Sequence, residues 1–330
     1  MQPNLQARNN APVIKINLPN FPLFHLCLLT LTLLNSPLAY SQKDSAWAMV
    51  ESPNFQVYYH PHVTSPQEIV DIAEDFWGTL DRLINGIPIG KIEIWVCETQ
   101  KQFQAAVHAP IQDWAIGCAF PLSRRIIIQN PTVILQREFR LAQVLRHEIV
   151  HIAFGQRTQN TIGKIPRWFV EGIAIYLSGE WLPARHESLI KHIFSKSVIP
   201  LTELAGNFPI SELQAQLAYA ESLDAVAWLV DIAGKEKLWE IIDRLGDGDD
   251  LDTAYKAAIG WDIATFDAQW RESLPKRYHW ARLFASSHLF WGSLALLFFL
   301  AYLRYRYHLR RQLAQLEQEE SEVDDFFKER

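Results

Sequence analysis

Two histidines and two glutamates have the residue types and the spacing to bind a metal ion and activate water. His147, Glu148 and His151 lie in the order His-Glu-Ile-Val-His. Residues four apart lie on the same face of a helix, so both imidazoles can bind one ion while Glu148 stays beside it. Glu171 follows further along the chain and is the candidate third ligand. Three protein ligands that leave a fourth position to water are typical of catalytic zinc.

The sequence around these residues predicts two helices that position them. Apolar residues recur at helical spacing from Leu141 to Phe154, and Gly155 follows as a stop signal. A second helix begins after Pro166, which suits a first-turn position, and carries Glu171 about one turn in. Two antiparallel helices joined by the loop 155–164 would direct all three ligands to one point.

The motifs of these two helices resemble those of the gluzincin, or peptidase MA-like, metallopeptidases. That family carries HExxH and, further along, a glutamate ligand within a W-x-x-E-G-x-A helix. The chain matches the second motif at four positions, which are Trp168, Glu171, Gly172 and Ala174. The metzincin extension of HExxH fits worse, because it requires a glycine and a histidine where this chain has Phe154 and Arg157.

The resemblance implies a role for each residue of the site. By it, the Zn²⁺ ligands are His147, His151 and Glu171. Glu148 is then the general base of a metallopeptidase with a thermolysin-like catalytic core. Zinc lowers the pKa of its bound water to about 7 and polarises a peptide carbonyl, while the glutamate passes a proton from water to the leaving amine.

A tetrahedral intermediate also needs a donor that stabilises its negative oxygen. Tyr219 is the candidate, because chains similar to this one carry a tyrosine-serine pair at the corresponding place, here within 217–222. A tyrosine that packs a helix against the core is the alternative interpretation of Tyr219. Tyr176, one turn beyond Glu171, is a second and weaker candidate.

The segment before the HExxH helix predicts a substrate-binding edge. Residues 115–130 have the pattern of two short strands with a turn at 121–124. Gluzincins bind peptides along an edge strand by main-chain hydrogen bonds. Ile116 to Phe120 is therefore the expected docking edge, and an ordinary buried hairpin is an equally weighted alternative.

The two ends of the chain predict an exported, membrane-anchored protein. Residues 1–41 have the layout of a signal peptide, with an apolar run and a small-residue cleavage site. Residues 283–303 carry no charge and have the length of a transmembrane helix, whereas a buried core helix is the alternative. We expect an extracytoplasmic zinc metallopeptidase domain at 42–282 and a cytoplasmic tail at 304–330, so that the catalytic domain of a single-pass cell-membrane protein faces the periplasm or the exterior.

The order of predicted elements indicates an α+β fold. Strands, helices and a hairpin precede the HExxH helix and form an N-terminal lobe with a small mixed β-sheet; they are expected at 55–59, 66–84, 91–97, 101–108 and 115–130. An all-α C-terminal lobe follows, with helices at 187–194, 211–216, 222–233, 235–245, 250–259 and 263–273. Cys97 and Cys118 could form one disulfide or remain two buried thiols.

These features predict a membrane-anchored zinc metallopeptidase that cleaves a peptide or protein substrate. A catalytically silent, membrane-tethered peptide-binding protein on the same scaffold is the alternative. A structural zinc site is disfavoured, because such sites close with four ligands rich in cysteine. The net charge of -6 over 330 residues gives no indication of a nucleic-acid partner.

Overall fold

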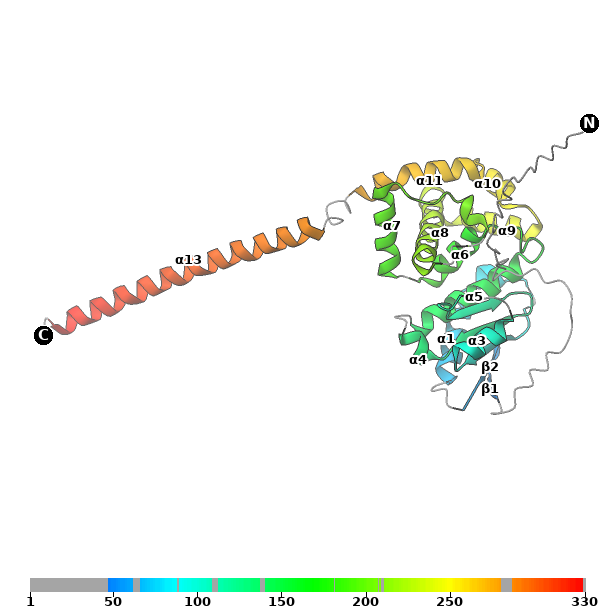
Figure 1. The fold of residues 1–330 in the computed structure, drawn as a ribbon, viewed down its shortest axis with the longest axis horizontal. Helices are drawn as coiled ribbons and strands as arrows, with labels where there is room; N and C mark the ends of the chain where they lie inside the picture. Colours follow the sequence, from blue (N-terminus) through cyan, green and yellow to red (C-terminus); the bar gives the residue numbers. More distant parts are fainter. Residues whose placement is uncertain are drawn as a thin grey trace, which may run out of the picture.

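A computed structural model describes residues 47–61, 66–87, 89–108, 112–136, 140–180, 182–206, 208, 211–279 and 287–328. The predicted signal peptide at 1–41 lies outside the described residues. Figure 1 shows a lobe that contains the sheet and, above it, a lobe of helices, with α5 (Leu141–Arg157) between them.

A mixed five-stranded sheet with the order β1-β2-β3-β5-β4 forms the core of the first lobe. Three parallel strands lie at its centre: β2 (Phe55–Tyr59), β3 (Ile92–Cys97) and β5 (Arg125–Gln129). The edge strands β1 (Ala48–Glu51) and β4 (Gly117–Phe120) pair antiparallel. β4 is the last strand of this order, so among the described residues one of its edges pairs with β5 and the other pairs with no strand. We call the second edge the free edge of β4.

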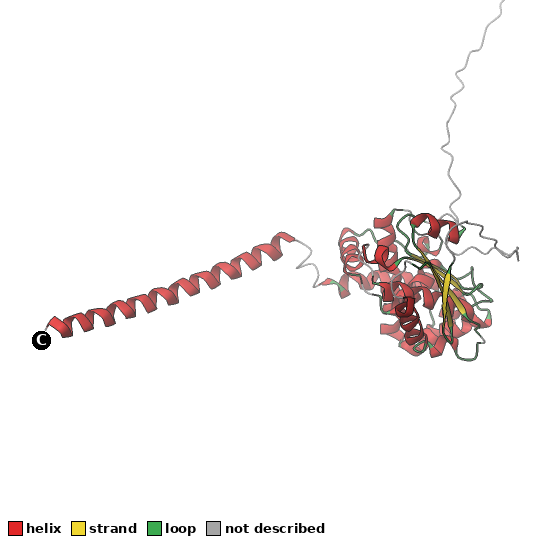
Figure 2. Ribbon diagram, turned by 90° about the horizontal axis from the view of Figure 1, so that it is seen from below, coloured by secondary structure: helices red, strands yellow, loops and turns green. Residues whose placement is uncertain are grey.

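Helices cover both faces of this sheet (Figure 2). The side chains of β2, β3 and β5 that alternate inward pack with α1 (Pro66–Trp77) and α5 in the main core. A smaller cluster on the other face packs β3, β4 and β5 against α3 (Gln100–Val107). The short helices α2 (Asp81–Ile84) and α4 (Pro131–Gln136) complete the lobe. β3 contributes to both clusters because successive side chains point to opposite faces: Ile92, Ile94 and Val96 join the main core, and Trp95 and Cys97 join the smaller cluster.

The second lobe is helical and has an aromatic core. Its elements are α6 (Arg167–Ser178), α7 (Pro183–Ser195), η1 (Glu203–Ala205), α8 (Glu212–Ala233), α9 (Lys235–Asp247), α10 (Leu251–Ile259) and α11 (Ile263–Arg277). Trp168 packs against Phe169, Tyr255 and Phe266, and all four side chains are buried. Trp168 belongs to the W-x-x-E-G-x-A motif, which we call the glutamate motif, so this core fixes the helix that carries Glu171.

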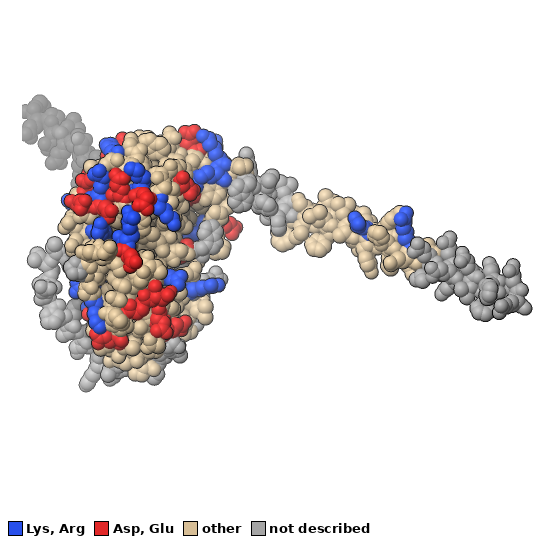
Figure 3. All heavy atoms as spheres, turned by 180° about the vertical axis from the view of Figure 1, so that it is seen from behind, with Lys and Arg blue, Asp and Glu red and all other residues tan. Residues whose placement is uncertain are grey.

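The surface in Figure 3 presents acidic and basic side chains intermixed rather than a field of one sign. Ion pairs between charged side chains include those of Arg244 with Glu240 and with Asp249.

The predicted transmembrane helix at 283–303 is wrong, and with it that part of the predicted fold class. Residues 283–286 lie outside the described residues, and α13 (Ser287–Lys328) covers the rest. No helix in the described ranges combines the length and apolar character needed to cross a bilayer. In α13 the continuous apolar stretch is 294–303, which spans about 15 Å, half of a hydrocarbon core of roughly 30 Å. Arg304 and Arg306 follow it directly.

The glycine of the glutamate motif allows α6 and α8 to pack closely. A Cβ at Gly172 would lie 2.5 Å from the backbone oxygen of Ser222 and 2.7 Å from Cγ2 of Val226. Backbone on one side of this contact leaves little room for relaxation. Gly172 therefore sets how closely α6, the helix that carries Glu171, packs against α8.

Gly172→Ala is expected to lower the free energy of unfolding by about 1–3 kcal/mol, the usual cost of overpacking a core. Chemical denaturation measures this free energy of unfolding. Gly78→Ala is the matched control, because a Cβ there would make only ordinary contacts at 3.7 Å. Equal stability of the two variants would contradict the close packing of α6 and α8.

Candidate metal centre

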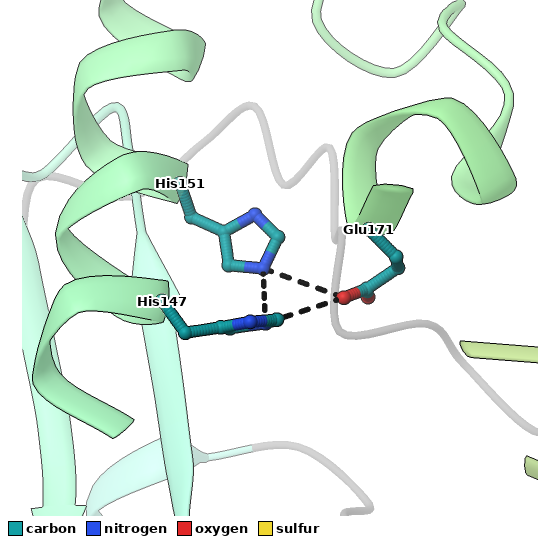
Figure 4. Close-up of side chains that lie close together, drawn as sticks. All are labelled: His147, His151 and Glu171. Carbon is teal, nitrogen blue, oxygen red and sulfur yellow. Dashed lines mark hydrogen bonds and ion pairs between the residues drawn. The ribbon is translucent and has the colours of Figure 1, made fainter. Parts of the chain in front are cut away.

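Three side chains from two helices lie at the corners of a small triangle (Figure 4). His147 and His151 project from α5, and Glu171 projects from α6 toward them. The Nε2 atoms of the two histidines are 3.0 Å apart. Oε2 of Glu171 lies 3.5 Å from Nε2 of His147 and 3.4 Å from Nε2 of His151.

The triangle has the size that a tetrahedral zinc ion requires. Ligand atoms at about 2.0–2.2 Å from zinc in a tetrahedron lie roughly 3.3–3.6 Å from one another. The three observed separations match this range to within about 0.3 Å. Two imidazoles and one carboxylate also form a recurring catalytic zinc set. In the described part of the chain, this is the single group of three or more histidine, cysteine or acidic residues that could hold a metal.

Glu148 lies beside this triangle and against the edge strand β4. It is buried, with 7 % of its surface exposed. An ideal Cβ at Gly117 would lie 2.5 Å from Oε1 of Glu148, so the carboxylate touches the strand where no side chain intervenes. The lack of a side chain at Gly117 therefore determines where Glu148 can sit.

The free edge of β4 offers backbone hydrogen-bonding groups beside Glu148. The backbone N–H of Gln129 on β5 donates to the backbone carbonyl of Ile116 at 3.0 Å. Gly117, the next residue, lies opposite Ile128 in the strand register. Hydrogen-bonded pairs alternate along an antiparallel ladder. Gly117 and Ala119 therefore direct their N–H and C=O groups away from β5, toward the free edge.

Glu180 and Arg185 support the first histidine, and the sequence did not single them out. Oε2 of Glu180 lies 2.9 Å from Nδ1 of His147. Nη1 of Arg185 donates to Oε1 of Glu180 at 2.7 Å. A carboxylate behind a metal-binding histidine fixes its ring and tautomer. Glu180 follows α6 and Arg185 is in α7, outside both motifs, so only a charged pair in an otherwise apolar stretch could have indicated them.

The carboxylates of this site favour a bound cation. Burial lowers the pKa of His147, but hydrogen bonds and charge from Glu171 and Glu180 outweigh it and raise that pKa to about 10. Burial raises the pKa of Glu171, yet the two histidines and Arg167 bring it well below its usual value. The site therefore binds a proton on His147 when no other cation competes.

A cleft of about 360 Å³ joins these residues to the free edge of β4. Tyr219 lines it, together with the three candidate ligands and Glu148, whereas Tyr176 is not among the lining residues. The Tyr219 ring lies 5.1 Å from the ring of Phe208 and 4.7 Å from the guanidinium of Arg185. The cleft thus brings Tyr219, the predicted donor, into the same space as the metal triangle.

The two cysteines of the described chain are both buried, and no disulfide joins them. Cys97 ends β3 and Cys118 is in β4, with β5 between them. Burial raises the pKa of the Cys97 thiol to about 12. Of the two alternatives for this pair, the structure has the two buried thiols.

Comparison with known proteins gives a family match and a curated relative. The family model described as Peptidase MA superfamily matches residues 76–276, which include both motifs. A Bacillus subtilis (strain 168) protein named "Uncharacterized protein YhcO" is 27 % identical over 140 residues, covering 41 % of each chain. The chain therefore spans about two fifths of the length of this curated relative.

Glu180→Gln is expected to weaken zinc affinity by about 10–100-fold, because the neutral amide no longer orients and polarises His147. Competition with a chromogenic chelator measures the dissociation constant. Glu187→Gln on α7 is the matched control and should bind zinc like the unaltered protein. Unchanged affinity in Glu180→Gln would contradict the supporting role of this carboxylate.

Proposed function

The chain belongs to the Peptidase MA superfamily, and on that basis we propose that it is a zinc-dependent metallopeptidase that hydrolyses peptide bonds. The observation that supports this most directly is the triangle of His147, His151 and Glu171, whose size fits tetrahedral zinc. The buried carboxylate of Glu148 beside it supports hydrolysis rather than a purely structural ion. The predicted signal peptide at 1–41 favours an activity outside the cytoplasm.

Each residue has a defined part in the proposed reaction. His147, His151 and Glu171 would hold the zinc ion, which when bound would act as a Lewis acid that acidifies water and polarises a carbonyl. Glu148 accepts a proton from the attacking water and passes it to the nitrogen of the departing amine. Tyr219 donates a hydrogen bond to the oxygen that becomes negative in the tetrahedral intermediate.

The free edge of β4 is the proposed binding site for the substrate backbone. A peptide in extended conformation can add to a sheet edge through main-chain hydrogen bonds, and here Gly117 and Ala119 provide them. This mode of binding places the peptide backbone against Glu148, because its carboxylate contacts the same strand. Recognition through the backbone also lets peptides of different sequence bind.

Glu148→Gln tests the proposed reaction. The zinc-loaded full chain should cleave members of a complex peptide library, and the variant should cleave them at least about 100-fold more slowly because it cannot accept the proton. Mass spectrometry identifies the products, and metal analysis should give equal zinc in both proteins. Equal cleavage by the variant would rule out Glu148 as the base, and bound zinc without cleavage by either protein would favour the silent peptide-binding alternative.

Gly117→Ala tests the contact between the strand and the general base. The added methyl group cannot occupy the present position of Oε1 of Glu148, so the carboxylate must move. A displacement of about 1 Å in a catalytic group can cost about 100-fold in turnover, and we expect a loss of that size in kcat with zinc affinity unchanged. Gly90→Ala is the control, because its Cβ would meet only the Arg124 side chain, at 3.5 Å. Full activity in Gly117→Ala would contradict this placement of Glu148.

A further inference from the structure

Two carboxylates at the metal centre divide their oxygens in the same way. Glu171 directs Oε2 toward both histidines, while its Oε1 lies 3.3 Å from Nε of Arg167. Glu180 directs Oε2 toward His147, and its Oε1 accepts a hydrogen bond from Arg185. Each carboxylate therefore has one oxygen for the metal site and one for an arginine.

Two cation–π contacts and one edge-to-face contact between aromatic rings join the two arginines. The guanidinium of Arg167 lies 4.7 Å from the ring centre of Phe208, and that of Arg185 lies 4.7 Å from the ring centre of Tyr219. The two rings meet edge to face, with centres 5.1 Å apart and planes at 72°. We call Arg167, Phe208, Tyr219 and Arg185 the arginine–aromatic arch.

The arch joins segments that are far apart along the chain. Arg167 begins α6 and Arg185 is in the first turn of α7, whereas Tyr219 is in α8 and Phe208 lies in the segment before α8. Gln216, also in α8, accepts a hydrogen bond from Nε of Arg185 at 2.7 Å. One continuous set of contacts therefore runs from the third candidate ligand to the carboxylate behind the first.

Both guanidinium groups are nearly buried, with only 12 % and 10 % of the Arg167 and Arg185 side chains exposed. A buried cation needs compensating contacts, and the negative face of an aromatic ring supplies one without competing for the carboxylate. Each ring also limits the positions that a long, flexible arginine side chain can take. The rings of Phe208 and Tyr219 can therefore hold the two guanidinium groups in place. The guanidinium groups in turn hold the carboxylates of Glu171 and Glu180 in place.

We infer that the arginine–aromatic arch positions Glu171 and Glu180 together, so that Phe208, which is not a ligand, determines the affinity of the site for zinc. This inference rests on the proposed zinc site. It separates two roles of Tyr219: the ring supports Arg185, and the hydroxyl serves the reaction. It also makes the two rings interdependent, because the loss of either one interrupts the same set of contacts.

The test measures zinc affinity by chelator competition in Phe208→Leu, Tyr219→Leu, their double variant and Tyr219→Phe, all in the full chain. Leucine keeps an apolar side chain but removes the ring face, whereas phenylalanine at 219 keeps the ring and removes the hydroxyl. Phe55→Leu on β2 is the control for the loss of a buried phenylalanine, since Phe55 is 0 % exposed and packs against Trp77. Visible spectra of the cobalt-loaded proteins report the ligand geometry independently of activity.

Both leucine variants should weaken zinc affinity by about 10-fold or more, the usual effect of losing an outer-shell partner. The double variant should lose less than the product of the single losses, since neighbours in one network are not additive. Tyr219→Phe and Phe55→Leu should bind zinc normally, although Tyr219→Phe should lower kcat. Altered cobalt spectra in the leucine variants are expected as well.

Normal zinc affinity and an unchanged cobalt spectrum in Phe208→Leu would overturn the inference about the arch. A loss of zinc affinity in Phe55→Leu equal to that in Phe208→Leu would overturn it as well. Failure of the proposed function has a different signature. Zinc bound by the unaltered protein without any peptide cleavage would contradict the peptidase alone, because the arch is judged by metal affinity. An unaltered protein that binds no zinc would overturn both proposals.

Discussion

Buried negative charge is the constraint on which the metal centre depends. Three glutamates there each expose 7 % of their surface, and they are Glu148, Glu171 and Glu180. Ionised carboxylates in such surroundings are unstable without positive partners. Arg167 pairs with Glu171, and Arg185 pairs with Glu180. A divalent cation at the triangle would add positive charge beside these carboxylates, and without one the raised pKa of His147 lets its ring carry a proton there.

The packing of helices fixes where these charged side chains lie. α5 lies between the sheet and the helical lobe, while α6 packs between α5 and α8, with the close approach at Gly172. The imidazoles and the Glu171 carboxylate thus come from two helices held by different parts of the core. The sheet contributes β4, whose free edge and unsubstituted Gly117 place backbone groups against Glu148. The candidate metal ligands, Glu148 and the free edge of β4 therefore meet where the two lobes join.

The sequence predicted what depends on local pattern. Helical spacing predicted α5, Pro166 predicted the start of α6, and two short strands around a turn at 121–124 predicted the β4–β5 hairpin. The sequence-based prediction failed where packing outweighs local signals. Gly155 does not end α5, which continues to Arg157. This glycine instead allows close packing, because a Cβ added there would lie 2.3 Å from Cβ of Pro121. The two helices expected at 211–216 and 222–233 form one, α8, since no glycine or proline interrupts the segment. Glu180, Arg185 and Phe208 reach the site only through tertiary contacts, which no spacing rule describes.

X-ray absorption spectroscopy of the zinc-loaded protein tests the central claim most directly, since it reports the atoms bound to the metal. The account predicts four nitrogen and oxygen neighbours at about 2.0–2.2 Å, with the multiple-scattering signal of two imidazoles and no sulfur. Loss of one imidazole signal in His147→Ala would assign the site. Sulfur at about 2.3 Å would instead indicate thiolate ligands such as Cys97 or Cys118, and would contradict the assignment of the metal to α5 and α6.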